Sequence, residues 1–232
     1  MRQISSVIGI GLTAGLLALG GAEAANGDII ESRFESVSPG RTIVYSIDAG
    51  RRYYYTSAGM FNWNRVGGDY SGPGAAEQYS SFCIELSQYI RYGHTYSFET
   101  RAVEDSPQPG AGMGADRAGR LSELFGRYFD EGFDAVEAAA FQTAVWEITH
   151  DEGMSLESGD FRLRDRDATF DQAQSWLTSI DGTGPQAELL VQSHSGAQDH
   201  VFLVPAPASF AAIGLACMAI GRRRRRDGAE IA

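Results

Sequence analysis

The hydrophobic period changes once along this chain, at a loop rich in proline and glycine that spans residues 106–114. From Asp28 to about Val103, short runs of alternating apolar and polar residues are separated by glycine-rich turns, which is the pattern of antiparallel strands. The run 79–90 predicts one such strand, and the run 94–103 is expected to pair back against it. The first part of the chain therefore predicts an antiparallel β-sandwich or sheet.

After the loop, apolar residues recur at helical spacing in three segments. These segments cover residues 118–129, 135–149 and 168–180. The second is apolar on nearly every side and is expected to be buried; Asp134 begins it with a capping-box sequence, and Asp167 is the expected cap of the third. A strand returns at 198–204. This order predicts an α+β fold in which a mainly helical insertion, at about 115–192, interrupts a β-rich domain.

The N-terminus has the three parts of a secretory signal peptide. Arg2 supplies a positive start, residues 7–19 form an apolar core, and Ala22 and Ala24 fit a small-x-small cleavage site. We therefore expect residues 1–24 to be removed and residues 25–203 to form the exported domain, which is long enough for one real core.

Residues 204–232 place a Pro-x-Pro motif, a short apolar helix and an arginine block in a fixed order. The motif and the block comprise Val204, Pro205, Ala206, Pro207, Arg222, Arg223, Arg224, Arg225 and Arg226. The helix between them, about 206–221, is somewhat shorter than the roughly 20 residues that span a bilayer core, and the arginines favour its cytoplasmic side. An ordinary single-pass anchor and a sorting tail both fit this pattern.

The tail resembles the PEP-CTERM sorting signal of Gram-negative bacteria, with Pro205-Ala206-Pro207 where the commonest form has Pro-Glu-Pro. The resemblance implies processing by an exosortase-type enzyme, with the C-terminal transmembrane helix in the membrane until then. It also implies a destination at the cell envelope, the cell surface or the extracellular matrix of a Gram-negative-type bacterium.

The exported domain is acidic and nearly free of thiols. Without the signal peptide and the tail it keeps 13 arginines and 27 acidic residues, a net charge of −14. Nucleic acid and anionic lipid both need a basic patch, so neither is expected as a partner. The chain has no lysine, and Cys83 is alone in this domain because Cys217 lies in the tail. An intrachain disulfide and a multi-cysteine zinc site are therefore excluded, and we expect no metal and no cofactor.

Cys83 and Gln142 are the residues whose positions most strongly suggest a chemical role. Cys83 lies in a strand expected to be buried, and Gln142 lies in the middle of the apolar helix. A buried glutamine amide that lacks hydrogen-bond partners costs about 1–3 kcal/mol, so some group should pair with it or react with it.

An aromatic-Cys strand followed by an apolar helix with Gln142 and Trp146 resembles the thioester domains of bacterial surface adhesins. In that family the cysteine sulfur attacks the glutamine carbonyl, expels ammonia and leaves an internal thioester. The resemblance implies that Cys83 is the sulfur partner and Gln142 the acyl partner, with Phe141 standing where the family has threonine. It implies adhesion or matrix attachment, through an amine of a surface protein or within a polysaccharide matrix. A carrier without lysine would not react with itself, and codon usage in a GC-rich genome predicts the same composition.

Other functions fit the same residues. Cys83 could be a plain core residue of a non-reactive structural or matrix protein. A cysteine hydrolase would need a histidine beside Cys83, for which His94 and His150 are the candidates. Glu85 and Glu147, together with these histidines, are the possible proton acceptors. We expect no turnover catalysis, because no hydrolase signature surrounds Cys83.

Aromatic residues on the predicted strands have two interpretations. Tyr53–Tyr55, Phe61 and Trp63 could together form a sugar-binding face. Alternating strand aromatics are also typical of core and cross-strand packing.

Overall fold

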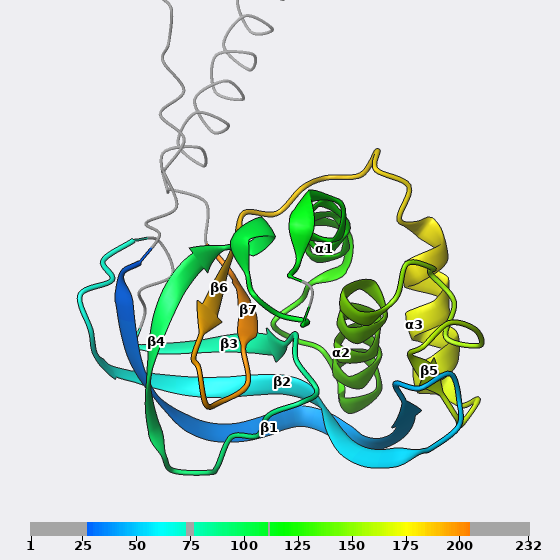
Figure 1. Cartoon of the computed structure of the whole chain (residues 1–232), viewed down its shortest axis with the longest axis horizontal. Helices are drawn as coiled ribbons and strands as arrows, with labels where there is room; N and C mark the ends of the chain where they lie inside the picture. Colours follow the sequence, from blue (N-terminus) through cyan, green and yellow to red (C-terminus); the bar gives the residue numbers. More distant parts are fainter. Residues whose placement is uncertain (1–26, 73–76, 111, 205–232) are drawn as a thin grey trace, which may run out of the picture.

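The computed structural model describes residues 27–72, 77–110 and 112–204. The predicted signal peptide and, apart from Val204, the predicted sorting tail lie outside these ranges. Within them, none of the helices has the length and apolar character needed to cross a membrane. Most strands lie on one side of the molecule and the helices on the other (Figure 1). Helix α2 (Ala135–His150) lies next to the strands, and the short strand β5 (Arg162–Leu163) lies on the helical side.

The strands pair only in antiparallel fashion and close into a ring. They are β1 (Ile29–Ser46), β2 (Tyr54–Gly67), β3 (Gln78–Cys83), β4 (Thr95–Ala102), β5 (Arg162–Leu163), β6 (Leu189–Ser193) and β7 (His200–Leu203). The order is β2-β3-β7-β6-β4-β1, and β1 pairs back with β2, while β5 extends the far end of β1. The α+β class is confirmed, but the sandwich is wrong: six strands form one closed barrel.

The long strand β1 is the reason that the sheet closes. It has 18 residues, and its first part pairs with β4 on one edge and with β2 on the other. Its register with β2 shifts between Val37 and Gly40, where the strand changes direction. A β-carbon at Gly59 would collide with the Pro39 carbonyl across this bend. Because one strand serves both edges, two separate packed sheets cannot form.

The barrel interior is aromatic with a small polar network. The rings of Trp63, Phe98 and His200 meet edge to face there. Trp63 Nε1 donates to Ser81 Oγ at 2.7 Å, so the Ser81 hydroxyl is free to donate to His200 Nδ1 at 3.2 Å. Complete burial lowers the pKa of His200 to about 3, which keeps this histidine neutral.

Three α-helices cover the outside of the barrel next to β3. They are α1 (Gly114–Tyr128), α2 (Ala135–His150) and α3 (Ala168–Ser179), and a short 3₁₀ helix, η1 (Val103–Asp105), precedes them. Asp134 caps α2 in a reciprocal capping box and Asp167 caps α3, as the sequence predicts. Every residue from Ala138 to Thr149 is buried, which confirms the expectation for the apolar helix. Phe82 of β3 packs against Phe141 of α2, which ties the helical layer to the barrel.

The strand boundaries differ from the sequence expectation in three respects. β3 ends at Cys83 instead of Ile90, and the chain from 84 to 94 is irregular. β4 pairs with β1 and β6, so the expected hairpin of 94–103 with 79–90 is wrong. β6 begins at Leu189, so the helical part ends a little before residue 192.

Candidate functional site

Cys83 lies at the end of β3, two residues beyond the last residue of β3 that pairs with β2. The last β2–β3 pair joins Phe61 to Ser81, while on the other side Cys83 is paired with His200 of β7. The Ile84 N–H donates to the Asp199 carbonyl at 3.0 Å. In an antiparallel ladder this leaves the N–H and C=O of Cys83 pointing toward the β2 side, where β2 no longer offers a partner.

The Gln142 side chain fills that position. The Cys83 N–H donates to Gln142 Oε1 at 2.9 Å, and Gln142 Nε2 donates to the Cys83 carbonyl at 2.8 Å. Both residues are fully buried. The amide thus replaces the next peptide of β2 and satisfies two main-chain groups that would otherwise be unpaired in the core.

Burial keeps the Cys83 thiol neutral. It raises the pKa of Cys83 to about 12, and the Glu85 and Asp199 carboxylates add to this effect. The Glu85 main chain and the Trp146 indole act in the opposite direction. The thiol donates to the Glu85 carbonyl at 2.7 Å. Trp146 Nε1 is buried and has no other hydrogen-bond acceptor among the described residues.

Two buried carboxyl groups lie near the sulfur. Glu85 accepts from the Ser87 hydroxyl and, at 3.3 Å, from the Asp199 N–H. Asp199 in turn accepts from Ser193 Oγ at 2.9 Å and from the His194 N–H at 2.8 Å. Burial, which outweighs these bonds, raises the pKa of Asp199 to about 6. The Asp199 carboxylate could therefore accept a proton at neutral pH.

The other predicted proton acceptors lie elsewhere. Glu147 accepts from the Ser155 N–H at 2.8 Å, and burial raises its pKa to about 8. His150 Nδ1 lies 3.1 Å from the Trp146 carbonyl, and burial lowers its pKa to about 4. His94 is exposed in the chain that leads into β4. Within the described ranges, no hydrogen bond or ion pair joins any of these three to Cys83 or Gln142.

Asp199 and His200 were missed by the sequence analysis, although both lie beside Cys83. The only available signal was a polar pair at the start of an apolar strand, Asp-His-Val-Phe-Leu. That pattern does not indicate which strand β7 pairs with. Three or more metal-binding side chains do not gather anywhere in the part of the chain that the structure describes.

The predicted sugar-binding face is not a single face. Phe61 and Trp63 are buried in the barrel, whereas Tyr53, Tyr54 and Tyr55 are exposed at its end. This interpretation of the five aromatics as one surface is wrong, because they lie on both the inside and the outside of the molecule.

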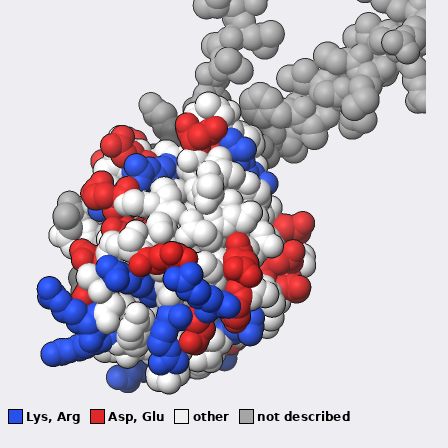
Figure 2. Space-filling view, turned by 90° about the vertical axis from the view of Figure 1, so that its right-hand side faces the viewer, with Lys and Arg blue, Asp and Glu red and all other residues white. Residues whose placement is uncertain are grey.

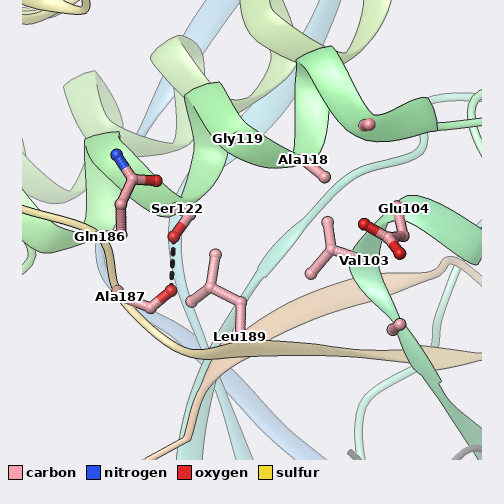
Figure 3. A pocket seen from close by; sticks show the side chains of 10 residues that line it. Val103, Glu104, Ala118, Gly119, Ser122, Gln186, Ala187 and Leu189 are labelled. Carbon is pink, nitrogen blue, oxygen red and sulfur yellow. Dashed lines mark hydrogen bonds between the residues drawn. The ribbon is translucent and has the colours of Figure 1, made fainter. Parts of the chain in front are cut away.

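A surface pocket of about 370 Å³ lies apart from Cys83, between η1, α1 and the chain that leads into β6 (Figure 3). The Ser122 hydroxyl donates to the Ala187 carbonyl across one wall of it. Its lining side chains are mostly small, and Glu104 is the one charged residue among them. This pocket offers neither a nucleophile beside a base nor a set of ligands.

Comparisons with protein-family models, with curated proteins and with solved structures found no match.

Proposed function

We propose that this chain is an exported, surface-sorted protein that attaches to its surroundings through an internal thioester between Cys83 and Gln142. The observation that carries the proposal is the pair of hydrogen bonds between the Gln142 amide and the main chain of Cys83, in a site closed to water. The Gln142 amide is thus held against the main chain of the residue that carries the sulfur before any bond forms, which favours a large effective molarity.

The orientation of the amide supports an attack by sulfur. Both bonds lie along the hydrogen-bonding direction of the sheet, so the amide plane follows the sheet. Strand side chains stand roughly perpendicular to a sheet, so the Cys83 sulfur rises above that plane. A nucleophile needs this direction to reach a carbonyl carbon. The Cys83 N–H already donates to Gln142 Oε1, where negative charge develops as sulfur adds.

The reaction balances without a co-reactant. The Sγ–Cδ bond forms, the Cδ–Nε2 bond breaks, and the thiol proton leaves with the amide nitrogen as ammonia. Because the Cys83 pKa is about 12, the proton must pass through a base, and Glu85 and Asp199 are the nearest carboxylates. The buried thioester is then protected from hydrolysis until an amine replaces the sulfur and forms an amide with the Gln142 acyl group. Each molecule reacts once, so this is not turnover catalysis.

Intact mass tests the proposal. The purified protein, prepared without reductant or amine buffer, is expected to be lighter than its sequence by one ammonia. Cys83→Ala and Gln142→Ala are expected to show their full calculated masses. Gln174→Ala is a matched control, because Gln174 also clamps main-chain groups but has no cysteine nearby, so this variant should keep the deficit. A wild type at full mass, with a Cys83 thiol that titrates after denaturation, would refute the thioester.

The second candidate is a non-reactive structural or matrix protein. The observation in its favour is that the Gln142 amide is already fully paired with Cys83, so a purely structural clamp accounts for its burial. The same mass measurement separates the two candidates. A hydrolase is less well supported, because His94 is exposed and His150 is hydrogen-bonded within α2. His200 is paired with Cys83, but its Nδ1 is hydrogen-bonded to Ser81 and complete burial lowers its pKa to about 3, so it is a poor base.

A further inference from the structure

Nearly half of the arginines of this acidic domain gather at one end of the molecule. Figure 2 looks onto the side that carries α3 and β5, and its lower part shows the basic side chains together, with acidic ones between them. The arginines of this end are Arg41, Arg51, Arg52, Arg162, Arg164 and Arg166. The remaining surface therefore carries most of the excess negative charge.

Two segments far apart in sequence build this end. One is the loop between β1 and β2, residues 47–53, with the first residues of β2. The other is the chain 160–166 around β5. β5 pairs with the end of β1, and the Ala49 N–H donates to the Asp160 carbonyl at 3.1 Å. We call six residues of these two segments the arginine–tyrosine surface: Arg51, Arg52, Tyr53, Tyr55, Arg162 and Arg164. All are exposed except Arg162, which is half-buried.

Three of these arginines are not neutralised by a neighbouring carboxylate. Arg51, Arg52 and Arg162 make no ion pair with any described residue, whereas Arg164 pairs with Asp165 at 3.2 Å. The nearby Asp48 carboxylate is already engaged: it accepts from the Ser46 hydroxyl and from the Arg52 main chain. The Asp48 charge still attracts Arg52, but it forms no ion pair with either guanidinium group, so Arg51 and Arg52 can each bind an external anion.

The tyrosines add flat faces beside these charges. Tyr55 is 72% exposed and Tyr53 40%. The Arg164 guanidinium lies 6.0 Å from the centre of the Tyr53 ring and also interacts with the Tyr55 hydroxyl. Arg164 therefore lies beside both rings, so a ligand that stacks on them would also meet its positive charge.

We propose that the arginine–tyrosine surface binds an acidic glycan, a polysaccharide whose sugars carry carboxylates. Tyrosine rings stack on the apolar faces of sugar rings, and arginine donates two parallel hydrogen bonds to a carboxylate. This inference does not depend on the thioester, because it uses other residues and a non-covalent contact.

The charge of the whole domain favours a glycan over nucleic acid. Duplex DNA carries about one charge per 1.7 Å, and a net charge of −14 repels such a dense polyanion strongly. A polyuronate carries at most one charge per sugar and is repelled much less. A membrane surface is less suited as well, since Ile47 is the one large aliphatic side chain exposed at this end among the described residues.

Titration calorimetry with the full protein tests the proposal, with polygalacturonate as the probe and its methyl ester as the uncharged control. We expect the acid form to bind, more weakly as salt rises, and the ester to bind at least about tenfold more weakly. The double variant Arg51→Gln/Arg52→Gln should lose at least about tenfold in affinity, and Tyr55→Ser should lose several-fold. Arg91→Gln removes an exposed arginine away from this surface and should bind like the wild type.

Three outcomes overturn the proposal. Equal binding of the ester shows that the carboxylates are not recognised. Unchanged affinity of the double variant shows that the glycan binds elsewhere. Tighter binding of single-stranded DNA or of phosphatidylglycerol vesicles than of polygalacturonate assigns the surface to another class of partner. Cys83→Ala should bind the glycan normally, so a failure of the thioester and a failure of this surface are distinguishable.

Discussion

Gln142 makes two buried hydrogen bonds to one residue, and their contribution to stability can be measured apart from any thioester. In the Cys83→Ala background no thioester can form, but the main chain of residue 83 still offers its N–H and C=O. Adding Gln142→Leu leaves both of these groups unpaired in the core. We expect the free energy of unfolding of the double variant, measured by chemical denaturation, to be about 2–5 kcal/mol lower than that of Cys83→Ala.

Gln174 provides the matched control for this measurement. It also makes two hydrogen bonds to main-chain groups, at Met154 and Leu156, but it is only half-buried. Water can replace those bonds, so Gln174→Leu should cost clearly less. If both substitutions cost the same, or if Gln142→Leu costs under about 1 kcal/mol, the amide is not the clamp that the structure shows.

The pairing of Cys83 with Gln142 could be anticipated from the sequence, but its surroundings could not. A polar amide in an apolar helix needs a partner, and the resemblance to thioester domains suggested which one. Asp199 and His200 come next to Cys83 only because β7 pairs with β3, and nothing in either strand specifies that pairing. His94 and His150, the histidines named from the sequence, have no hydrogen bond or ion pair with Cys83 in the described part of the chain.

At the scale of elements, the start of α2 determines how Gln142 reaches the sheet. The Asp134 carboxylate accepts from the N–H groups of Val136 and Glu137, and the Glu137 side chain accepts from the Asp134 N–H. Asp134→Ala is expected to lower the free energy of unfolding by about 1 kcal/mol, because these first-turn N–H groups lose their acceptor. Glu131→Ala, which changes an exposed acid in the same turn, should be within about 0.5 kcal/mol of the wild type. If the two substitutions lowered the free energy of unfolding equally, the effect would come from the lost negative charge and not from the lost helix cap.

The helices were predicted well because their signals are local, and the strands less well because their signals are not. Caps at Asp134 and Asp167 and a regular apolar spacing fix α2 and α3 within a residue or two. By contrast, the end of β3 at Cys83 depends on where β2 departs and where α2 arrives. The closure of the barrel depends on the bend in β1, which the sequence marks only by Pro39 and Gly40.

At the scale of the whole molecule, buried titratable groups make stability depend on pH. Glu147 has a pKa raised from 4.5 to about 8, and Asp199 from 3.8 to about 6, both chiefly by burial. A carboxyl group whose pKa is higher in the folded than in the unfolded state contributes its full stability below the unfolded-state pKa. That contribution to stability is lost as pH rises through the folded-state pKa. Burial lowers the pKa of His150 to about 4 and of His200 to about 3, so their contributions are lost as pH falls below about 6.5.

These opposite effects predict the shape of the stability profile. Between pH 8 and about 7 Glu147 has the largest difference in protonation between the folded and unfolded states, so stability should rise by up to about 1 kcal/mol for each pH unit of acidification. As pH approaches 6.5, the two buried histidines begin to oppose this rise. Below about pH 6, Asp199 acts in the same direction but the two histidines oppose it, so the profile should level off.

Glu147→Gln isolates the first part of this profile, because glutamine keeps the oxygen that accepts from the Ser155 N–H but does not titrate. Chemical denaturation at several values between pH 7 and 8 should show stability that rises on acidification for the wild type. For Glu147→Gln the line should be flat or fall slightly, because the two buried histidines remain. Asp151→Asn, which neutralises an acid whose charge raises the Glu147 pKa, should shift the wild-type profile toward lower pH without abolishing it. Parallel profiles for wild type and Glu147→Gln would mean that Glu147 is ionised in the folded protein, and that water reaches the end of α2.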